Sequence, residues 1–442
     1  MHFYLSFAAL ALGLCLTAGC RTYAPAPIDW SREASEWNGS ATNRIPLTLE
    51  TARQLALVLN PDINALRLAR QSASRKALAS GWWEDPSFNL DALRVLRGGA
   101  HPWLLGSGLS FTLPVNGVPG IEAKAAQAYA HADALAVTVA ERTLLAEVER
   151  AWNACRINQH CIAAQHAYKE RLLDRERQIR ALIAAGELPK AEGDRVAQER
   201  IKLDLECLCC GAEAVTQKHT LLRLLGLHPA APFDIVSDDA DGAQPAPPSV
   251  IADLDLIRHP RVQEKLARLK ATEEDLRAEI RRQYPDIEAG PLWEHEDGGA
   301  NMGASIGFNL PLWNRNRLGI AEAEGGRDAT RLEALNEWRG LVTELHEARA
   351  ILQVAETKER GMRETLLPEA QASAERTERL FAQGEADVLA VLAADETVYT
   401  VQESLLTVQQ ELAEARIRID LLRVEKPADN QPLLSGEFDE TR

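Results

Sequence analysis

The chain has 442 residues and a formal net charge of −16 at pH 7. This acidity argues against a protein that holds nucleic acid through its phosphates, because such proteins carry basic surfaces. Hydrophobic residues make up 46% of the chain but aromatic residues only 5%, a composition typical of long helices.

The N-terminal residues have the pattern of a lipoprotein precursor. Residues 3–16 are apolar and too short to cross a bilayer as a helix. They lead into the motif LTAGC, ending at Cys20, which resembles the lipobox of bacterial lipoproteins. The resemblance implies that residues 1–19 are a signal peptide, that Cys20 is acylated, and that Arg21 after it favours sorting to the outer membrane. We expect residues 20–46 to be an extended, acylated leader.

The mature chain is predicted to contain two copies of one repeat, residues 47–228 and 249–425. Proline pairs frame a helical stretch in each copy, and the two prolines are 25 residues apart both times. The pairs are Asn60-Pro61 with Asp85-Pro86, and His259-Pro260 with Tyr284-Pro285. A repeat of this length is a duplicated half-protein rather than a solenoid unit. Residues 229–248 are predicted to be a linker, or equatorial segment, and residues 426–442 a disordered tail.

Each copy is predicted to continue into two β-strands. In the first copy Phe88, Leu90 and Ala92 alternate with polar residues, and a second strand covers residues 108–113. In the second copy every other residue of 302–310 is apolar, and those between are small or polar. This alternation is typical of strands with lipid on one face and water on the other. Several of the tryptophans flank these strands, as expected at a membrane interface.

Long helices are predicted before and after the strands. Thr48 has the character of an N-cap for a helix over residues 48–80. The outgoing helices, Ile121 to Gly186 and Ile320 to Gly384, can each reach about 100 Å. Apolar heptads predict coiled-coil packing of these helices and of the shorter return helices. The heptad positions are Trp338, Leu341, Leu345, Ala348, Leu352 and Ala355; Ile201, Leu205, Leu208, Ala212, Val215, His219 and Leu222; and Val398, Val401, Leu405, Val408, Leu412, Ala415, Ile419 and Leu422.

This layout resembles the TolC-like outer-membrane efflux proteins over nearly the whole mature chain. The resemblance rests on the proline pairs, on two Leu-Pro strand ends, and on LFAQGEADVL at residues 380–389 with its weaker counterpart at 185–188. It implies a mainly α-helical chain with a duplicated strand-strand-long helix-helix repeat. Three chains would form one trimeric 12-stranded membrane β-barrel and an α-helical coiled-coil tunnel. Four strands are too few to close a barrel around a wet lumen alone, which favours the trimer.

The two turns between long helices are predicted to be the periplasmic tips. Gly186 and Gly384 supply the left-handed residue that such turns need. The acidic residues beside them are Glu187, Glu192, Glu385 and Asp387. In a trimer each would form a ring of three carboxylates that attracts cations or narrows the mouth. The alternative is that they are ordinary acids at helix N-termini, stabilised by the helix dipole.

Five cysteines follow Cys20 in the sequence. Cys161 lies 25 residues before Gly186 and Cys210 lies 24 after it, so an antiparallel hairpin can place them side by side. A disulfide in an oxidising compartment is one interpretation, and buried free thiols are the other. Soft-metal binding by Cys207 and Cys210 is a third. We predict neither a metal site nor a cofactor.

The sequence contains no phosphate-binding loop, no HEXXH motif and no nucleophile elbow, so we expect no enzyme. The resemblance implies the outer-membrane channel of a tripartite efflux system, lipid-anchored in a Gram-negative-type bacterium. It would pass small molecules or metal ions received from a periplasmic adaptor and an inner-membrane transporter. Two alternatives remain: a type I protein-secretion exit duct, and a periplasmic coiled-coil scaffold lipoprotein that transports nothing.

Overall fold

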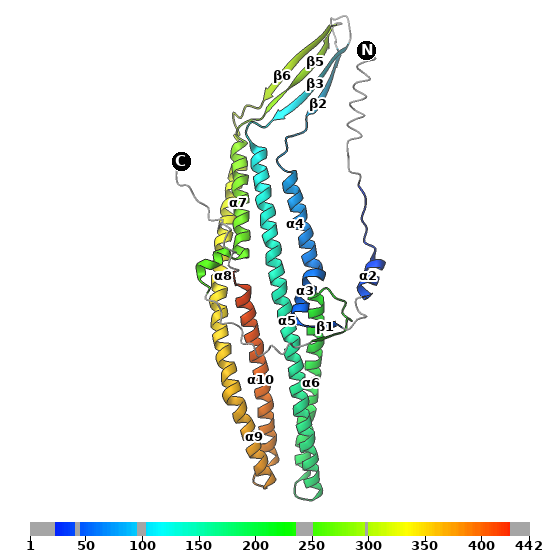
Figure 1. Cartoon of the computed structure of the whole chain (residues 1–442), viewed down its shortest axis with the longest axis vertical. Coiled ribbons are helices and arrows are strands. Elements are labelled where there is room, and N and C mark those ends of the chain that lie inside the picture. Colours follow the sequence, from blue (N-terminus) through cyan, green and yellow to red (C-terminus); the bar gives the residue numbers. More distant parts are fainter. Residues whose placement is uncertain (1–22, 40–44, 95–102, 236–250, 297–298, 425–442) are drawn as a thin grey trace.

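The computed structural model describes residues 23–39, 45–94, 103–235, 251–296 and 299–424. The molecule is elongated, with a four-stranded sheet at one end and long helices over the rest of its length (Figure 1). Two helical hairpins end together at the end opposite the sheet (Figure 1). The fold is therefore mainly helical, as predicted.

The first repeat has the predicted order of elements. They are α3 (Leu49–Leu59), α4 (Pro61–Ala79), β2 (Ser87–Arg94), β3 (Trp103–Leu113), α5 (Val118–Ala184) and α6 (Lys190–Leu224). The 67 residues of α5 span about 100 Å, from the sheet to one tip. The shorter α6 returns only to the middle of the molecule, where α3 and then α4 complete the path back to the sheet (Figure 1).

The second repeat has the same order. Its elements are a 3-10 turn (Asp253–Arg258), α7 (Pro260–Arg281), β5 (Ile287–Glu296), β6 (Gly299–Phe308), α8 (Arg317–Gly361), α9 (Leu367–Ala382) and α10 (Val388–Leu421). Strand β6 ends at Phe308 rather than at Leu310, because its partner β5 begins with Ile287, the residue that pairs with Phe308. Among the described residues, no helix combines the length and the apolar character needed to cross a bilayer.

Side-chain caps set the starts of the helices before the sheet. Thr48 caps α3 as predicted: its Oγ1 accepts a hydrogen bond from the backbone N–H of Thr51 at 3.2 Å. Asn60 then caps α4, its Oδ1 accepting the N–H groups of Asp62 and Ile63. Pro61 can begin a helix but cannot donate a backbone hydrogen bond inside one. The stretch predicted as one helix over 48–80 is therefore two helices.

The apolar heptads of α8 and α10 form the core of the second repeat, as predicted. Leu341 and Leu345 pack beside Leu422 at the end of α10. Leu352 packs beside Ile419 in the next cluster. Full burial stabilises each of these side chains by about 1.5–3 kcal/mol relative to exposure, so the seam holds the two helices together along their length.

The apolar heptad of α6 does not face the partner helix, and this part of the coiled-coil prediction is wrong. Val196 and Leu203 are the α6 residues buried against α5 and α10. Leu205 and Leu208 of the predicted seam are 60% and 70% exposed. The two faces lie roughly 150° apart around the helix. Only Leu222, at the end of the predicted seam, is buried.

A π turn, Met362–Leu366, joins α8 and α9 into one helical path. Pro368 follows it after one residue, Leu367. A proline inside a helix lacks the N–H group and its ring clashes with the carbonyl four residues earlier, here that of Glu364. The wider π turn accommodates this clash. The second outgoing helix is thus continuous, with a local irregularity that α5 does not have.

Two segments predicted to be irregular contain short elements. β1 (Ile45–Leu47) pairs in parallel with β4 (Phe233–Ile235), so the leader and the equatorial segment meet at the middle of the molecule. Leu47 is buried there with Ala52. A helix, α2 (Trp30–Gly39), lies within the predicted extended leader, which is therefore not extended throughout. Strands of three residues are too short for a periodicity to reveal them.

Candidate functional site

The sheet joins two hairpins that are far apart in the sequence. Its strands are antiparallel in the order β2-β3-β5-β6. The hairpins meet where β3 pairs with β5, with Phe111 opposite Ala289. Gly290 makes the close approach possible, because a Cβ atom there would meet the carbonyl oxygen of Leu109 at 1.7 Å. β2 and β6 remain as the two outer strands.

The strand register gives the sheet one apolar face and one polar face. Residues directly opposite each other on neighbouring strands share a face. The apolar face carries Phe88, Leu90, Ala92, Leu109, Phe111, Leu113, Ile287, Ala289, Trp293, Met302, Ala304, Ile306 and Phe308. The other face carries Asn89, Asp91, Ser110, Thr112, Glu288, Glu294, Asn301, Ser305 and Gly307. Arg94 and Ser107 are exceptions on the first face, and Leu93 and Leu292 are exceptions on the second.

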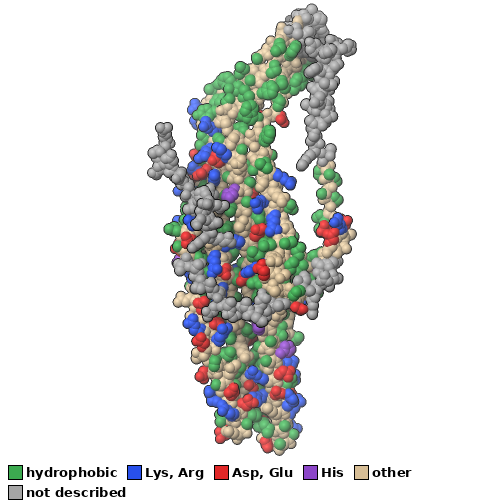
Figure 2. Space-filling view, in the orientation of Figure 1, with side chains coloured by type: hydrophobic (Ala, Val, Ile, Leu, Met, Phe, Trp, Pro, Cys, Tyr) green, Lys and Arg blue, Asp and Glu red, His purple; other side chains and the backbone are tan. Residues whose placement is uncertain are grey.

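Among the residues that the structure describes, none covers the apolar face. Ile306 is 75% exposed and Met302 74% exposed. Figure 2 shows hydrophobic side chains over the strand end, whereas Lys, Arg, Asp and Glu gather over the helices. An apolar surface of this extent marks contact with a membrane or with another protein.

Both tips are built on the glycine turn predicted from the sequence. Gly186 has φ 79° and Gly384 has φ 75°, in the left-handed region that favours glycine. At the first tip Glu187 N donates to Leu182 O at 2.9 Å. At the second tip Glu385 N makes the equivalent bond to a Leu carbonyl, also at 2.9 Å. These are Schellman caps, which satisfy the last carbonyls of each outgoing helix.

The four predicted tip acids have different surroundings. Glu187 and Glu385 are exposed at the turns. Asp387 caps α10, its Oδ1 accepting the N–H of Ala390 at 2.8 Å. Glu192 is half-buried in the first turn of α6, with Oε2 3.6 Å from Nη1 of Arg195. The structure therefore gives Asp387 a local helix-capping contact, whereas the carboxylates of Glu187 and Glu385 face solvent.

A buried ion pair joins the two helical hairpins, α5 with α6 and α8–α9 with α10, between the tips and the middle of the molecule. Arg175 on α5 contacts Asp395 on α10 at 3.1 Å, and side-chain exposure is 9% and 7%. Its Nη1 also lies 3.0 Å from Glu378 on α9. These two carboxylates raise the pKa of Arg175 against the opposing effect of burial. We name this set the inter-hairpin bridge. The sequence did not predict this bridge, because charged side chains in helices are usually solvated.

An aromatic contact lies beside the inter-hairpin bridge. The rings of Tyr168 on α5 and Tyr399 on α10 stack with centroids 4.7 Å apart and an interplanar angle of 9°. Burial raises the pKa of Tyr399 to about 12, so its hydroxyl is neutral at physiological pH. Together with the bridge, the stack links the first hairpin to the second.

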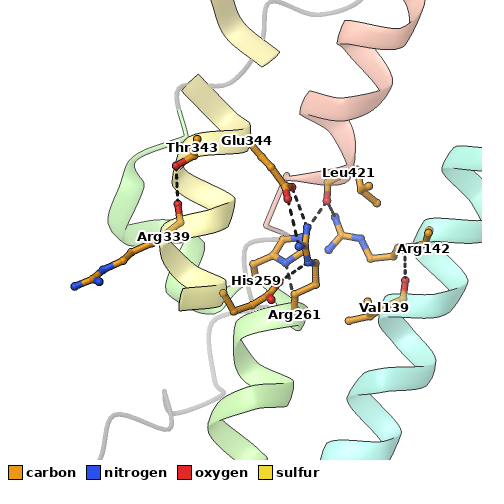
Figure 3. A network of polar contacts seen from close by, with 10 residues as sticks. Val139, Arg142, His259, Arg261, Arg339, Thr343, Glu344 and Leu421 are labelled. Atoms are coloured by element: carbon orange, nitrogen blue, oxygen red, sulfur yellow. Dashed lines mark hydrogen bonds and ion pairs between the residues drawn. The ribbon is translucent and has the colours of Figure 1, made fainter. Parts of the chain in front are cut away.

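Near the middle of the molecule, His259 connects three elements. It caps α7, with Nδ1 3.3 Å from the N–H of Arg261, and its Nε2 lies 3.0 Å from the carbonyl oxygen of Leu421. Figure 3 shows Arg142 of α5 reaching the same carbonyl, and Arg261 pointing to Glu344 of α8. Burial lowers the pKa of His259 to about 4. The first repeat has the same device in Asn60, whose Nδ2 donates to Leu224 O at 2.9 Å.

The hairpin brings the two predicted cysteines together. The Sγ atoms of Cys161 on α5 and Cys210 on α6 are 4.0 Å apart, and both are free thiols in the structure. In the described part of the chain, no group of three or more His, Cys, Asp or Glu side chains is placed to hold a metal ion. Cys20, the predicted acylation site, lies outside the described residues.

Comparisons with known proteins find one family model and several solved structures that resemble this chain. Residues 252–422 match the model of the outer membrane efflux protein family. Among solved structures, CusC has a TM-score of 0.74 at 16% identity, covering 85% of this chain and 91% of that one. A membrane protein from Pseudomonas aeruginosa has a TM-score of 0.71 at 18% identity, covering 92% and 96%. The outer membrane protein VceC from Vibrio cholerae has 0.71 at 15%, covering 85% and 95%.

A comparison with curated protein sequences finds no match. At identities of 15–18% the structural likeness shows the fold, and the family match covers the second repeat. Both agree with the resemblance predicted from the proline pairs and the second tip. Residues 252–422 of this chain thus match the outer membrane efflux protein family, and the chain shares its fold with solved outer-membrane channels.

Proposed function

We propose that this protein is the outer-membrane channel subunit of a tripartite envelope efflux system in a Gram-negative-type bacterium. The observation that carries the proposal is the uncovered, two-faced sheet at one end of a helical bundle about 100 Å long. The family match of residues 252–422 and the shared channel fold support it. In this arrangement the sheet lies in the membrane and the helices extend across the periplasm.

The channel is proposed to be a homotrimer. Each chain has two outer strands, β2 and β6, whose free edges cannot remain unpaired in lipid. Pairing β6 of one chain with β2 of the next gives a closed 12-stranded barrel from three chains. The apolar face then contacts lipid, and the polar face lines the lumen. The three charged side chains described on the polar face, Asp91, Glu288 and Glu294, are all acidic, which favours cations as cargo.

The exposed heptad of α6 supports the trimer from a second part of the molecule. Its exposed apolar members are Ile201, Leu205, Leu208 and Val215. They form an apolar seam that no other described residue of the chain covers. A second copy of the chain is the occupant that fits a coiled-coil seam running along the tunnel. We name these four residues the α6 seam.

The tips are proposed to be the gate, and the inter-hairpin bridge to hold it closed. A periplasmic adaptor that binds the open arrangement more tightly than the closed one would shift the equilibrium toward opening. Glu187 and Glu385 are proposed to ring the mouth, while Glu192 and Asp387 act mainly on their own helices. The energy would come from an inner-membrane transporter that supplies small molecules or metal ions.

The remaining parts of the chain are proposed to serve as anchors and connections. Cys20 would carry the acyl chains after removal of residues 1–19, with residues 20–46 as leader. Residues 426–442, predicted from the sequence to be a disordered tail, lie outside the described residues. Residues 47–228 and 249–425 are the two repeats, and 229–248 connects them at the equator. A lipid anchor alone binds a membrane weakly, so barrel and anchor act together.

A matched pair of substitutions on neighbouring residues tests the proposal. Ile306→Arg places a charge on the proposed lipid face and should cost about 2–4 kcal/mol if the position lies near the bilayer midplane. Ser305→Arg places the same charge on the proposed lumen face and should be tolerated. We expect I306R to abolish trimers with heat-dependent mobility on gels and conductance in planar bilayers, and S305R to retain both. Equal behaviour of the two variants, or no conductance from the unmodified protein, would favour the non-transporting scaffold.

A further inference from the structure

The first hairpin contains one pair of thiols at a common level. Cys161 on α5 and Cys210 on α6 are 49 residues apart in the sequence, yet their Sγ atoms are 4.0 Å apart. Gln165, on the next turn of α5, is fully buried and donates its amide N–H to Sγ of Cys210 at 2.9 Å. The sulfur of Cys210 is therefore oriented toward α5.

The other cysteines of the described chain are placed differently. Cys207 packs against the cluster that contains Val196 and Leu203. Cys209, next to Cys210, is exposed. Cys155 is buried in a separate cluster around Trp152. Cys209 thus lies on the exposed side of α6, Cys207 lies against the other cluster, and Cys210 is the one whose Sγ contacts Sγ of Cys161.

We propose that Cys161 and Cys210 form an intrachain disulfide that staples the first hairpin once the chain reaches the periplasm. This rests on the proposed function, because that function places the helices in an oxidising compartment. The two thiols lose two electrons and two protons as the Sγ–Sγ bond forms, and the disulfide of a protein thiol oxidase is reduced to two thiols. The sulfur atoms must approach from 4.0 Å to about 2.05 Å for the bond to form.

The surroundings suit a structural bond rather than a reactive one. Burial raises the pKa of the Cys161 thiol to about 12, with the neighbouring Cys210 adding to the effect. Nothing here stabilises the thiolate that a labile, easily reduced disulfide requires. Closing a loop of this length also restricts the unfolded chain, which stabilises the folded hairpin.

The staple would make the two hairpins unequal. No cysteine occurs after Cys210, so α8, α9 and α10 cannot form an equivalent disulfide. Gln165 lies 3.5 Å from the hydroxyl of Tyr399, and Tyr168 stacks on the same ring. The stapled α5–α6 pair therefore forms a fixed surface against which the second hairpin rests and from which it can move.

The first test uses purified protein and asks whether Cys161 and Cys210 are close enough to form a bond under oxidising conditions. The full chain in detergent is treated with oxidised glutathione, alkylated without reductant and digested with trypsin. Cleavage after Arg156, Lys169, Lys202 and Lys218 puts Cys161 alone in residues 157–169 and the three α6 cysteines in residues 203–218. We expect these two peptides to be joined, with fragmentation locating the bond at Cys210. A bond to Cys207 or Cys209, or stable glutathione adducts on Cys161 and Cys210, would overturn the proposal.

Variants and a cellular measurement complete the design. C209S and C207S should keep the joined peptides, whereas C161S should lose them and leave Cys210 open to alkylation. Reductant should lower the thermal midpoint of the unmodified protein by several degrees and leave that of C161S unchanged. In membranes prepared from cells with thiols blocked at lysis, we expect the same bond. Its formation in vitro but not in cells would contradict the periplasmic location, and so the proposed function, while leaving the pairing geometry supported.

Discussion

At the residue scale, His259 links proton binding to the stability of the middle of the molecule. Burial holds its pKa near 4, below the ordinary value of 6.5, while Arg142, Arg261 and Glu344 are the charged groups around it. The unfolded chain therefore binds a proton at this site more readily than the folded chain. The stabilisation is fully present above pH 6.5 and is lost as the pH falls toward 4, with a total of about 3 kcal/mol.

The first repeat supplies the control for this prediction. His259→Asn reproduces the residue that performs the same cap and carbonyl contact at position 60. We expect H259N to keep the thermal midpoint at pH 7.5 within a few degrees and to flatten its decline between pH 6.5 and 4. His259→Ala, which removes both contacts, should lower the midpoint at every pH. An H259N profile as steep as that of the unmodified protein would assign the pH effect to other groups.

Among the tip acids, the exposed Glu187 and Glu385 are predicted to set the preference of the channel for cations. Replacing Glu187 and Glu385 together by Gln should reduce the preference for cations in single-channel recordings, because six carboxylates leave the mouth of the proposed trimer. Asp387→Asn should leave selectivity nearly unchanged, since that carboxylate contacts its own helix and Asn can also cap. Unchanged selectivity in the double variant would remove the proposed ring.

At the scale of elements, the inter-hairpin bridge should determine how easily the two hairpins separate. Arg175→Met leaves Asp395 buried without its partner, which costs about 3–5 kcal/mol at such sites. We expect R175M to open more often in planar bilayers. Lys202→Met is the control, because Lys202 also joins the first hairpin to α10, through Glu396 at 3.0 Å, but both side chains are about half exposed. Such exposed pairs contribute at most about 1 kcal/mol.

The α6 seam is predicted to determine assembly rather than folding. Leu208→Glu puts a charge into the seam, and should dissociate the trimer while leaving the helical signal of the single chain intact, because Leu208 is 70% exposed. Thr220→Glu, exposed on another side of the same helix, should leave the trimer unchanged. Mass photometry in detergent gives both results. A trimeric L208E would mean that the seam faces a different partner.

These elements also show what a heptad can and cannot predict. Apolar spacing correctly identified the faces on which α8 and α10 pack against each other, because the heptad of each helix lies on that face. On α6 the same spacing identified the wrong face, because this helix has two apolar faces and the stronger pattern lies on the exposed one. Arg175 and Asp395 were missed since buried and solvated charges look alike in a sequence. β1 and β4 are too short to leave a pattern.

At the scale of the whole molecule, the duplication made the layout predictable. Prolines 61 and 260 stand at helix starts, prolines 86 and 285 stand just before strands, and glycines 186 and 384 form the tip turns, so each feature occurs once in each repeat. Pro and Gly act through their own backbone chemistry, so their structural effect can be predicted from the sequence of a single chain. How the chains of the proposed trimer would meet is not readable in that way, because nothing in the described part of one chain covers the surfaces involved.

The π turn makes the two tips unlike each other. A π turn changes the angular phase of everything beyond it, so side chains below Met362–Leu366 point in directions different from their counterparts on α5. Near the sheet, three chains with two matched repeats each would present an approximate sixfold pattern. At the far end that pattern reduces to a threefold one, with two kinds of tip in alternation. A hexameric adaptor ring would therefore have to use two different docking contacts, even if its own subunits were identical.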